Sequence, residues 1–288
     1  MQRRSHSIAV TFAALGLLLV VLSSAAMAQW NWQTPRPQGN TLFRVDFVDS
    51  TNGWAVGEYG TALRTIDGGL TWYEQEYART DNLLAVSMVS DSSGWIAGDN
   101  GVVLHTTNGG DDWLEQVTPT NAGLNAITFI DPLRGWAAGD NETILRTTNG
   151  GTSWTLQRQA NGNAASINAI TFLDSVNGWA VGSNRSLFHT TNGGAAWTKQ
   201  LVGSSPSTYQ SVQFVTSALG FIAGSGGILL RTEDGGTAWT PVVTGVTNNL
   251  NEIVMQNSIV GWIGGDAGAL LKTINGGLTW SHATVGDG

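Results

Sequence analysis

One pattern of glycine, tryptophan and threonine residues recurs six times along the 288-residue chain. Each copy contains Gly-Trp-Ala-Val-Gly or a close variant, then a turn, a short apolar run and Thr-x-Asp/Asn-Gly-Gly-x-x-Trp. The closing tryptophans of successive copies lie 41 to 43 residues apart. A repeat of this length, with so little drift in its register, indicates one structural unit copied in tandem.

Each repeat carries four short strand signals separated by turn residues. In the third copy these are Leu124–Phe129, Gly135–Ala138, Thr143–Thr147 and Ser153–Gln157, all rich in apolar or β-branched residues. No window of helical length after the first 28 residues shows a 3.6-residue apolar period. One four-stranded sheet cannot bury both of its faces, so the copies must stack. The sequence therefore predicts an all-β fold, a single β-propeller of four-stranded antiparallel blades.

Six complete repeats predict six blades, with seven as the alternative. An additional tryptophan-led segment, Gln29–Thr34, precedes the first repeat and matches Trp72–Gln75 at a distance of 42 residues. Both ends of the chain thus offer a fourth strand, Gln29–Thr34 and Thr279–Val285. We expect six blades, with the N-terminal strand closing the ring by adding to the last blade. The alternative is a partial seventh blade.

The turn before each closing tryptophan has its own physical explanation. A side-chain oxygen in the turn can accept backbone N–H bonds, and two glycines supply backbone conformations that other residues resist. The buried indole contributes up to about 4–6 kcal/mol per blade. The turn residues and closing tryptophans are Asp67, Asn108, Asn149, Asn192, Asp234, Asn275, Trp72, Trp113, Trp154, Trp197, Trp239 and Trp280. Since asparagine serves in four of the six turns, we expect a structural role and no metal site.

The first 28 residues have the three parts of a secretory signal peptide. Arg3 and Arg4 precede an apolar run, and small residues ending at Ala28 form a cleavage site. We therefore expect residues 1–28 to be removed and residues 29–288 to form the propeller. The protein is then exported, to a periplasm, a lumen or the extracellular space. No later stretch is apolar enough for a transmembrane segment.

Charge and cysteine content narrow the classes of partner. The formal net charge is −8, and removal of Arg3 and Arg4 makes the remainder more acidic. An acidic chain is poorly suited to bind nucleic acid or anionic lipid nonspecifically. The chain has no cysteine, which excludes thiolate metal sites and disulfides. We expect no cofactor.

The repeat resembles a known family of propellers. The Thr-x-Asp-x-Gly-x-x-Trp turn is similar to the Asp-box, or BNR repeat, of sialidases and related proteins. The whole period, best seen in Gly53–Trp72, resembles the photosystem II stability/assembly factor family, and the resemblance extends from Trp30 to Trp280. It implies an exported, non-enzymatic protein that holds subunits of a membrane complex during assembly. Photosynthetic members are described as seven-bladed, whereas this chain offers six full units.

A basic residue stands just before the Asp-box threonine in every repeat. These residues are Arg64, His105, Arg146, His189, Arg231 and Lys272. A ring of donors near the Asp-box face would suit a carboxylate-rich partner. The alternative is a solvent-facing strand position at which each cation pairs with a neighbouring turn.

The opposite face is predicted to carry an acidic residue in four blades. Glu58, Asp99, Asp140 and Asp266 lie in turns between the second and third strands. Variable loops on a rigid frame commonly bind partners, but these residues are also ordinary hairpin-turn chemistry.

The innermost strands carry a third polar group, formed by Arg44, Asp46, Gln213 and Glu252. Because ring closure makes the first and last blades neighbours, we expect Arg44 and Glu252 to pair across the seam.

Catalytic patterns are weak, so we expect a binding protein with no catalytic residue. A sialidase needs an arginine cluster and a tyrosine with a nearby glutamate, and none of the four tyrosines stands in such a constellation. Glu58 and Asp140 are a conceivable carboxylate pair for glycoside hydrolysis. The alternative functions are therefore an extracellular carbohydrate-binding propeller or a sialidase-like glycoside hydrolase.

Overall fold

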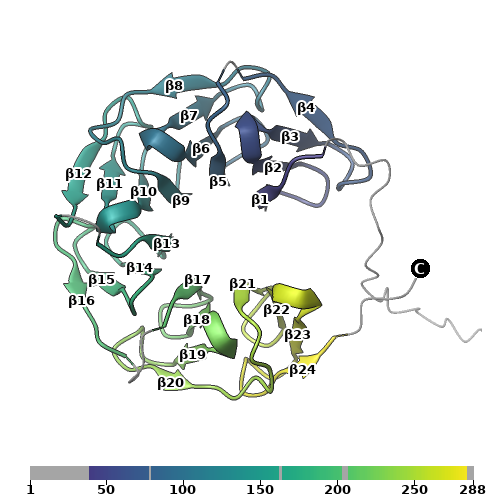
Figure 1. The fold of residues 1–288 in the computed structure, drawn as a ribbon, viewed down its shortest axis with the longest axis vertical. Coiled ribbons are helices and arrows are strands. Elements are labelled where there is room, and N and C mark those ends of the chain that lie inside the picture. The colour runs from purple at the N-terminus through teal and green to yellow at the C-terminus, as the bar shows by residue number, and fades with distance from the viewer. Residues whose placement is uncertain (1–38, 78, 162–163, 203–206, 284–288) are drawn as a thin grey trace, which may run out of the picture.

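The computed structural model describes residues 39–77, 79–161, 164–202 and 207–283. The predicted signal peptide and the N-terminal strand Gln29–Thr34 lie outside these residues. Six four-stranded antiparallel sheets stand around a central channel (Figure 1), and each is a meander of consecutive strands. The predicted six-bladed β-propeller is confirmed. In the described ranges, no helix is long and apolar enough to span a bilayer.

The blades are numbered 1 to 6 in chain order, and their strands run from the channel outward. The innermost strands are β1 (Leu42–Phe47), β5 (Leu83–Met88), β9 (Leu124–Phe129), β13 (Ile167–Phe172), β17 (Tyr209–Phe214) and β21 (Leu250–Met255). The second strands are β2 (Gly53–Gly57), β6 (Gly94–Gly98), β10 (Gly135–Gly139), β14 (Gly178–Gly182), β18 (Gly220–Gly224) and β22 (Gly261–Gly265). The third strands are β3 (Ala62–Thr65), β7 (Val103–Thr106), β11 (Ile144–Thr147), β15 (Leu187–Thr190), β19 (Leu229–Thr232) and β23 (Leu270–Thr273).

The outermost strands are shorter and more exposed. They are β4 (Tyr73–Gln75), β8 (Leu114–Gln116), β12 (Thr155–Arg158), β16 (Thr198–Lys199), β20 (Thr240–Pro241) and β24 (Ser281–His282). Single 3₁₀ turns join the second and third strands of five blades: η1 (Glu58–Gly60), η2 (Asp99–Gly101), η3 (Asp140–Glu142), η4 (Ser225–Gly227) and η5 (Asp266–Gly268). The last blade takes its fourth strand from β24, so addition of the N-terminal strand to that blade stays a prediction.

The Asp-box turn is closed by the threonine and acid that the sequence pattern combines. The Thr65 hydroxyl accepts from the Gly69 N–H at 2.8 Å, and Asp67 Oδ1 accepts from the Thr71 N–H at 2.9 Å. Gly68 and Gly69 have φ values of +73° and +87°, which disfavour any side chain. Hydrogen bonds from Thr71 lower the pKa of Asp67. An asparagine oxygen accepts the same backbone bond in blade 2, from Asp112 N–H to Asn108 Oδ1 at 3.0 Å.

Aromatic rings join each blade to the next. Trp95 of blade 2 lies parallel to Phe129 of blade 3, with 3.5 Å between ring centroids, and Trp154 meets the edge of Phe129 at 5.9 Å. The same stack and edge contact join Trp136, Phe172 and Trp197 between blades 3 and 4. The hydrophobic core therefore lies between the sheets and continues from blade to blade.

A glutamine on the outermost strand completes several of these junctions. The Trp95 indole and the Gln116 amide both donate to the Gly150 carbonyl, at 3.1 and 2.9 Å. The Trp154 indole donates in turn to Gln116 Oε1 at 3.1 Å. We call this arrangement the glutamine clasp. Gln75 makes the same clasp between blades 1 and 2, with the Gly109 carbonyl and the Trp113 indole.

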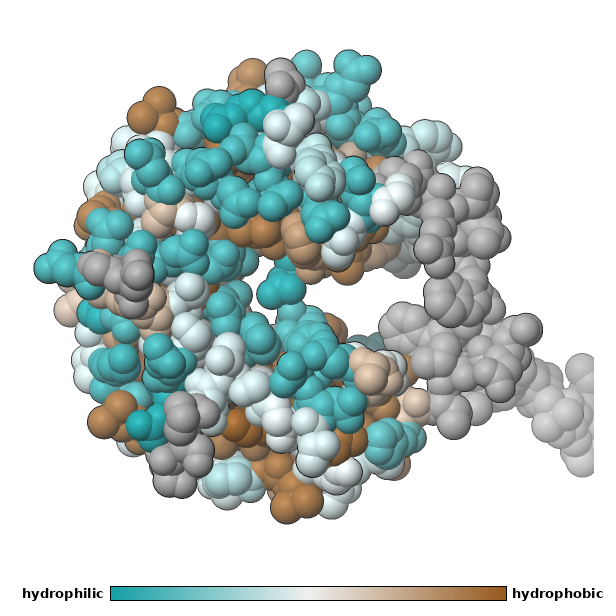
Figure 2. All heavy atoms as spheres, in the orientation of Figure 1, coloured by the Kyte–Doolittle hydropathy of each residue, from teal (hydrophilic) through white to brown (hydrophobic). Residues whose placement is uncertain are grey.

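One junction of the ring differs from the others. Figure 2 shows an opening between blades 1 and 6 that runs outward from the centre of the ring. The wall on blade 1 is apolar and uncovered, with Leu42, Val45 and Phe47 exposed by 44%, 57% and 42%. Described residues leave this seam without the stacked aromatic contact found at three of the other five junctions.

A buried ionic group braces blades 3 and 4. Glu142, only 6% exposed, contacts the Arg158 guanidinium and lies 3.4 Å from Lys199 Nζ. Both cations lie over the buried Phe188 ring. Burial alone raises the pKa of Glu142, but the hydrogen bond and charge of Arg158, with Lys199, lower it on balance.

Replacing Gln116 by alanine should lower the free energy of unfolding by about 1–3 kcal/mol. The change leaves the buried Trp154 indole without its acceptor, which carries a cost of that size. Chemical denaturation measures the effect. The matched control is Gln157→Ala, since Gln157 donates only within its own strand, to Thr155 Oγ1 at 2.9 Å. Equal losses in the two variants would contradict the clasp.

Replacing Glu142 by glutamine should cost about 1–2 kcal/mol at pH 7, a value reduced because Arg158 and Lys199 remain partly hydrated. The folded-state pKa of Glu142 lies below its unfolded value. Its stabilisation is therefore present above the unfolded pKa of about 4.3 and lost as the pH falls through the folded pKa. Denaturation of both proteins at pH 7 and pH 3 should show a difference that shrinks in acid. Glu74→Gln, at an exposed position, should show no difference at either pH.

Candidate functional site

The six basic residues before the Asp-box threonines are half-buried, and each lies against an aromatic ring of its own blade. Each is paired in register with the aromatic residue of the second strand, as Arg64 is with Trp54. The distances to the ring centroids are 5.5 Å for Arg64, 5.8 Å for Arg146, 5.9 Å for Arg231, 5.4 Å for Lys272, 4.5 Å for His105 and 4.7 Å for His189. These residues therefore cover the aromatic layer, and Arg64 and Arg231 also contact the Asp-box turn of the next blade, as the alternative expected.

The ring of basic residues is not uniformly charged. Burial lowers the pKa of both His105 and His189, so both imidazoles are neutral at pH 7. The other four positions hold arginine or lysine: Arg64, Arg146, Arg231 and Lys272. The positive positions are thus unevenly spaced around the ring.

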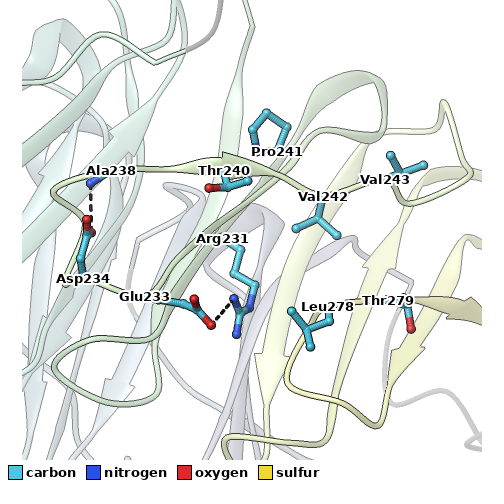
Figure 3. A pocket seen from close by; sticks show the side chains of 10 residues that line it. All are labelled: Arg231, Glu233, Asp234, Ala238, Thr240, Pro241, Val242, Val243, Leu278 and Thr279. Atoms are coloured by element: carbon cyan, nitrogen blue, oxygen red, sulfur yellow. Dashed lines mark hydrogen bonds and ion pairs between the residues drawn. The ribbon is translucent and has the colours of Figure 1, made fainter.

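The Arg231 side chain lines a surface groove of about 620 Å³ between blades 5 and 6 (Figure 3). It is held by Glu233, 2.7 Å from Nη1, and by the Gly276 carbonyl, which accepts from Nε at 2.8 Å. Apolar side chains form part of the groove wall, with Val243 exposed by 89% and Leu278 by 61%. These apolar walls could not be predicted from the sequence, because their exposure depends on how adjacent blades are offset.

An equivalent groove of about 450 Å³ lies at Arg64 between blades 1 and 2. Arg64 Nη1 lies 3.7 Å from Asp111 Oδ1, and the side chains of Ile66 and Tyr73 are exposed along the groove. In both grooves the arginine is mostly covered while its acidic partner is largely exposed. An external carboxylate can therefore replace that exposed acid on the guanidinium, beside an apolar surface.

The acidic residues of the opposite face support the turns that carry them. Asp140 Oδ1 accepts from the Ser166 hydroxyl at 2.7 Å, and Asp99 Oδ2 accepts from the Asn82 amide at 2.9 Å. Glu58 accepts from the Thr41 N–H at 3.2 Å. Asn251 and Asn249 donate to Asp266 and lower its pKa. Their proposed contact with a partner stays a prediction.

Three of the four polar residues of the innermost strands, Arg44, Asp46 and Glu252, line the central channel, a cavity of about 510 Å³. Gln213 instead accepts from the Met255 N–H at 2.6 Å. The predicted pair is present, with Arg44 Nε 3.9 Å from Glu252 Oε2. Ser211 donates to Glu252 at 2.6 Å, and the Met88 N–H donates to Asp46 at 2.7 Å. The channel walls surround both carboxyl groups, and this desolvation raises their pKa values.

The residues considered for catalysis do not form a common site. Glu58 and Asp140 lie in η1 and η3, in blades separated by blade 2, and each is held by its own contacts. Tyr209 is buried and donates to the Val202 carbonyl at 3.1 Å. Among the residues that the structure describes, no three His, Cys, Asp or Glu side chains are grouped as a metal site.

Solved structures share the fold at low sequence identity. YCF48 bound to D1 peptide is 21% identical with a TM-score of 0.50, over 85% of this chain and 96% of that one. The GH74 xyloglucanase from Xanthomonas campestris is 13% identical with a TM-score of 0.69, over 85% of this chain and 45% of that one. The RRP9 WD40 repeats are 8% identical with a TM-score of 0.71, over 86% and 81%. These similarities show the propeller fold alone.

No curated protein matches the chain. The model of the photosynthesis system II assembly factor YCF48 family matches it four times, over residues 22–122, 114–204, 161–247 and 200–287. These matches together extend over all six blades, and they bear out the resemblance drawn from the Asp-box repeat. The chain therefore belongs to the photosystem II assembly factor YCF48 family of β-propellers.

Proposed function

We propose that this chain is an exported, non-enzymatic propeller that binds a protein partner and assists the assembly or stability of a membrane protein complex. Its family supports this role. A structure of YCF48 was solved with a D1 peptide bound, so a propeller of this kind can hold a peptide segment. Export is supported by the signal-peptide pattern of residues 1–28.

The observation that carries the proposal is the pair of grooves at Arg64 and Arg231. Each combines a mostly covered guanidinium, an exposed acidic partner and exposed apolar side chains. A guanidinium fixed by packing loses little side-chain entropy when it binds a carboxylate. The groove therefore suits a peptide segment that carries a carboxylate beside an apolar residue.

The overall charge of the protein limits how such a partner is recognised. With a formal net charge of −8, the protein does not attract an acidic partner over long distances. Recognition is therefore local, at the arginines. An acidic surface also disfavours competing interaction with anionic lipid headgroups.

Affinity capture from solubilised membranes of the source organism tests this function. The triple variant Arg64→Gln, Arg146→Gln, Arg231→Gln removes the charges but keeps side-chain bulk over the aromatic rings. It should weaken capture of membrane-complex subunits, identified by mass spectrometry, by about tenfold or more, which corresponds to about 1.4 kcal/mol.

The matched control changes the opposite face, with Asp99→Asn, Asp140→Asn and Asp266→Asn. Each substitution keeps one side-chain oxygen as a hydrogen-bond acceptor for its turn, and capture should remain within about twofold of the unmodified protein, near 0.4 kcal/mol. Circular dichroism and unfolding midpoints verify that both variants fold. Equal capture by the arginine variant, or recovery of no membrane-complex subunit, would contradict the proposal. Binding or cleavage of a polysaccharide would favour the glycoside-directed alternative.

A further inference from the structure

The junction between blades 5 and 6 departs from the repeat at two positions. The second strand of every other blade carries a tryptophan at the place of Phe221. The clasp position, three residues after the closing tryptophan, holds glutamine in blades 1 to 4 but Val242 in blade 5. Both side chains pack in the apolar core of this junction. Because neither side chain has a hydrogen-bond donor, neither can donate to the Asp-box turn of blade 6.

The carbonyl of Gly276 in that turn is therefore left to Arg231, whose Nε donates to it at 2.8 Å. Between blades 1 and 2, the equivalent Gly109 carbonyl accepts from an indole and from the Gln75 amide. The Nε atom of Arg64 is buried there and has no hydrogen-bond partner among the described residues. The two substitutions in blade 5 thus give Arg231 a backbone anchor that the equivalent arginine of blade 1 lacks.

The anchored guanidinium is prepared to bind a carboxylate. Its Nη1 lies 2.7 Å from Glu233, and the Glu233 side chain is 72% exposed while that of Arg231 is 13% exposed. Figure 3 shows Arg231 between Glu233 on one side and Val242 and Leu278 on the other. A carboxylate that displaces Glu233 meets a donor fork whose direction is already fixed.

The wall beside the guanidinium is apolar for the same reason. Val242 takes the place of a clasp amide, and Val243 and Leu278 line the groove with it. Between blades 1 and 2, Gln75 lines the groove, and Asp111 stands at the turn position of Leu278. A large apolar side chain of a ligand is therefore removed from water between blades 5 and 6, whereas it meets polar groups at the equivalent place between blades 1 and 2.

We propose that the groove between blades 5 and 6 is the principal peptide site of the propeller, and that it takes an acidic side chain next to a large apolar one. The acidic group replaces Glu233 on Arg231, and the apolar group packs on Val242 and Leu278. Phe221 is a positioning residue, because its lack of a donor leaves the turn carbonyl to Arg231. This inference rests on the proposed protein-binding function and narrows it to one groove and one ligand pattern.

NMR titration of the full chain with an end-blocked peptide tests the ligand pattern. The peptide carries one Glu-Leu pair among glycines and serines, and replacing its glutamate by glutamine or its leucine by serine should weaken binding about fivefold or more. In the protein, Leu278→Ser should weaken binding of the Glu-Leu peptide by about the same factor. The matched control is Leu70→Ser, at the same turn position of blade 1 and also exposed, which should leave the affinity within about twofold.

Two further variants test what sets the groove. Val242→Gln restores the glutamine of the repeat, and it should weaken binding of the Glu-Leu peptide about tenfold and remove its preference over the Glu-Ser peptide. Phe221→Trp supplies an indole donor for the Gly276 carbonyl. It should shift the Nε–H resonance of Arg231 and raise its solvent exchange about tenfold, whereas the Nε–H of Arg64 should not respond. Unfolding midpoints verify that the variants fold.

The outcomes separate this inference from the proposed function. Equal binding of the Glu-Leu peptide and its glutamine analogue, unchanged binding in Leu278→Ser and Val242→Gln, or no binding at all would overturn the groove assignment. An Arg231 Nε–H that ignores Phe221→Trp would overturn the positioning role. If the groove fails while the triple arginine variant still loses membrane-complex subunits, the proposed function stands. If the peptide binds as expected but no such subunit is captured, the groove stands and the assembly function fails.

Discussion

The ring depends on the aromatic residue of each second strand packing against the Asp-box turn of the next blade, from Trp54 to Phe221. At three junctions a tryptophan indole also donates a hydrogen bond to a glycine carbonyl of that turn. The Trp54 and Trp136 indoles make this bond to Gly109 and Gly193, at 2.8 and 2.9 Å. The acceptor belongs to the Asp-box turn, whose glycines hold positive φ angles. The turn, the indole and the aromatic stack therefore form one interblade unit, and the chain needs no disulfide to keep its blades in register.

Packing between the blades determines which residues remain available to bind a partner. The basic residues of the repeat cover the aromatic layer, which explains why they recur, and the edges of the blades differ from one junction to another. At Arg64 and Arg231 the edge opens into a groove with an exposed acid and apolar walls. A rigid frame of this kind positions small binding surfaces that differ between blades.

The fold was predictable because the same pattern of strand and turn residues occurs in six consecutive copies. The innermost strand of blade 3 was predicted with the bounds that the structure has, Leu124–Phe129, and Arg44 and Glu252 meet as expected. The fourth strand of that blade begins later than predicted, at Thr155, because Ser153 and Trp154 belong to the turn.

Features that depend on neighbouring blades could not be predicted from the repeat. The stacking of basic side chains on the second strand requires the register between strands, and the groove at Leu278 requires the offset between blades. The Glu142 brace joins residues from three separate positions around a backbone with φ of +53°, a conformation that sequence patterns do not suggest for glutamate. The uncovered wall of blade 1 appears only once five other blades show what covers it.

Hydrogen exchange of the protein, alone and with its captured partner, tests the central claim most directly. The account predicts added protection in the segments that line the arginine grooves, residues 64–76 and 231–243, and near Leu278. Protection confined to the turns at Asp99, Asp140 and Asp266, or no protection anywhere on the propeller, would contradict it.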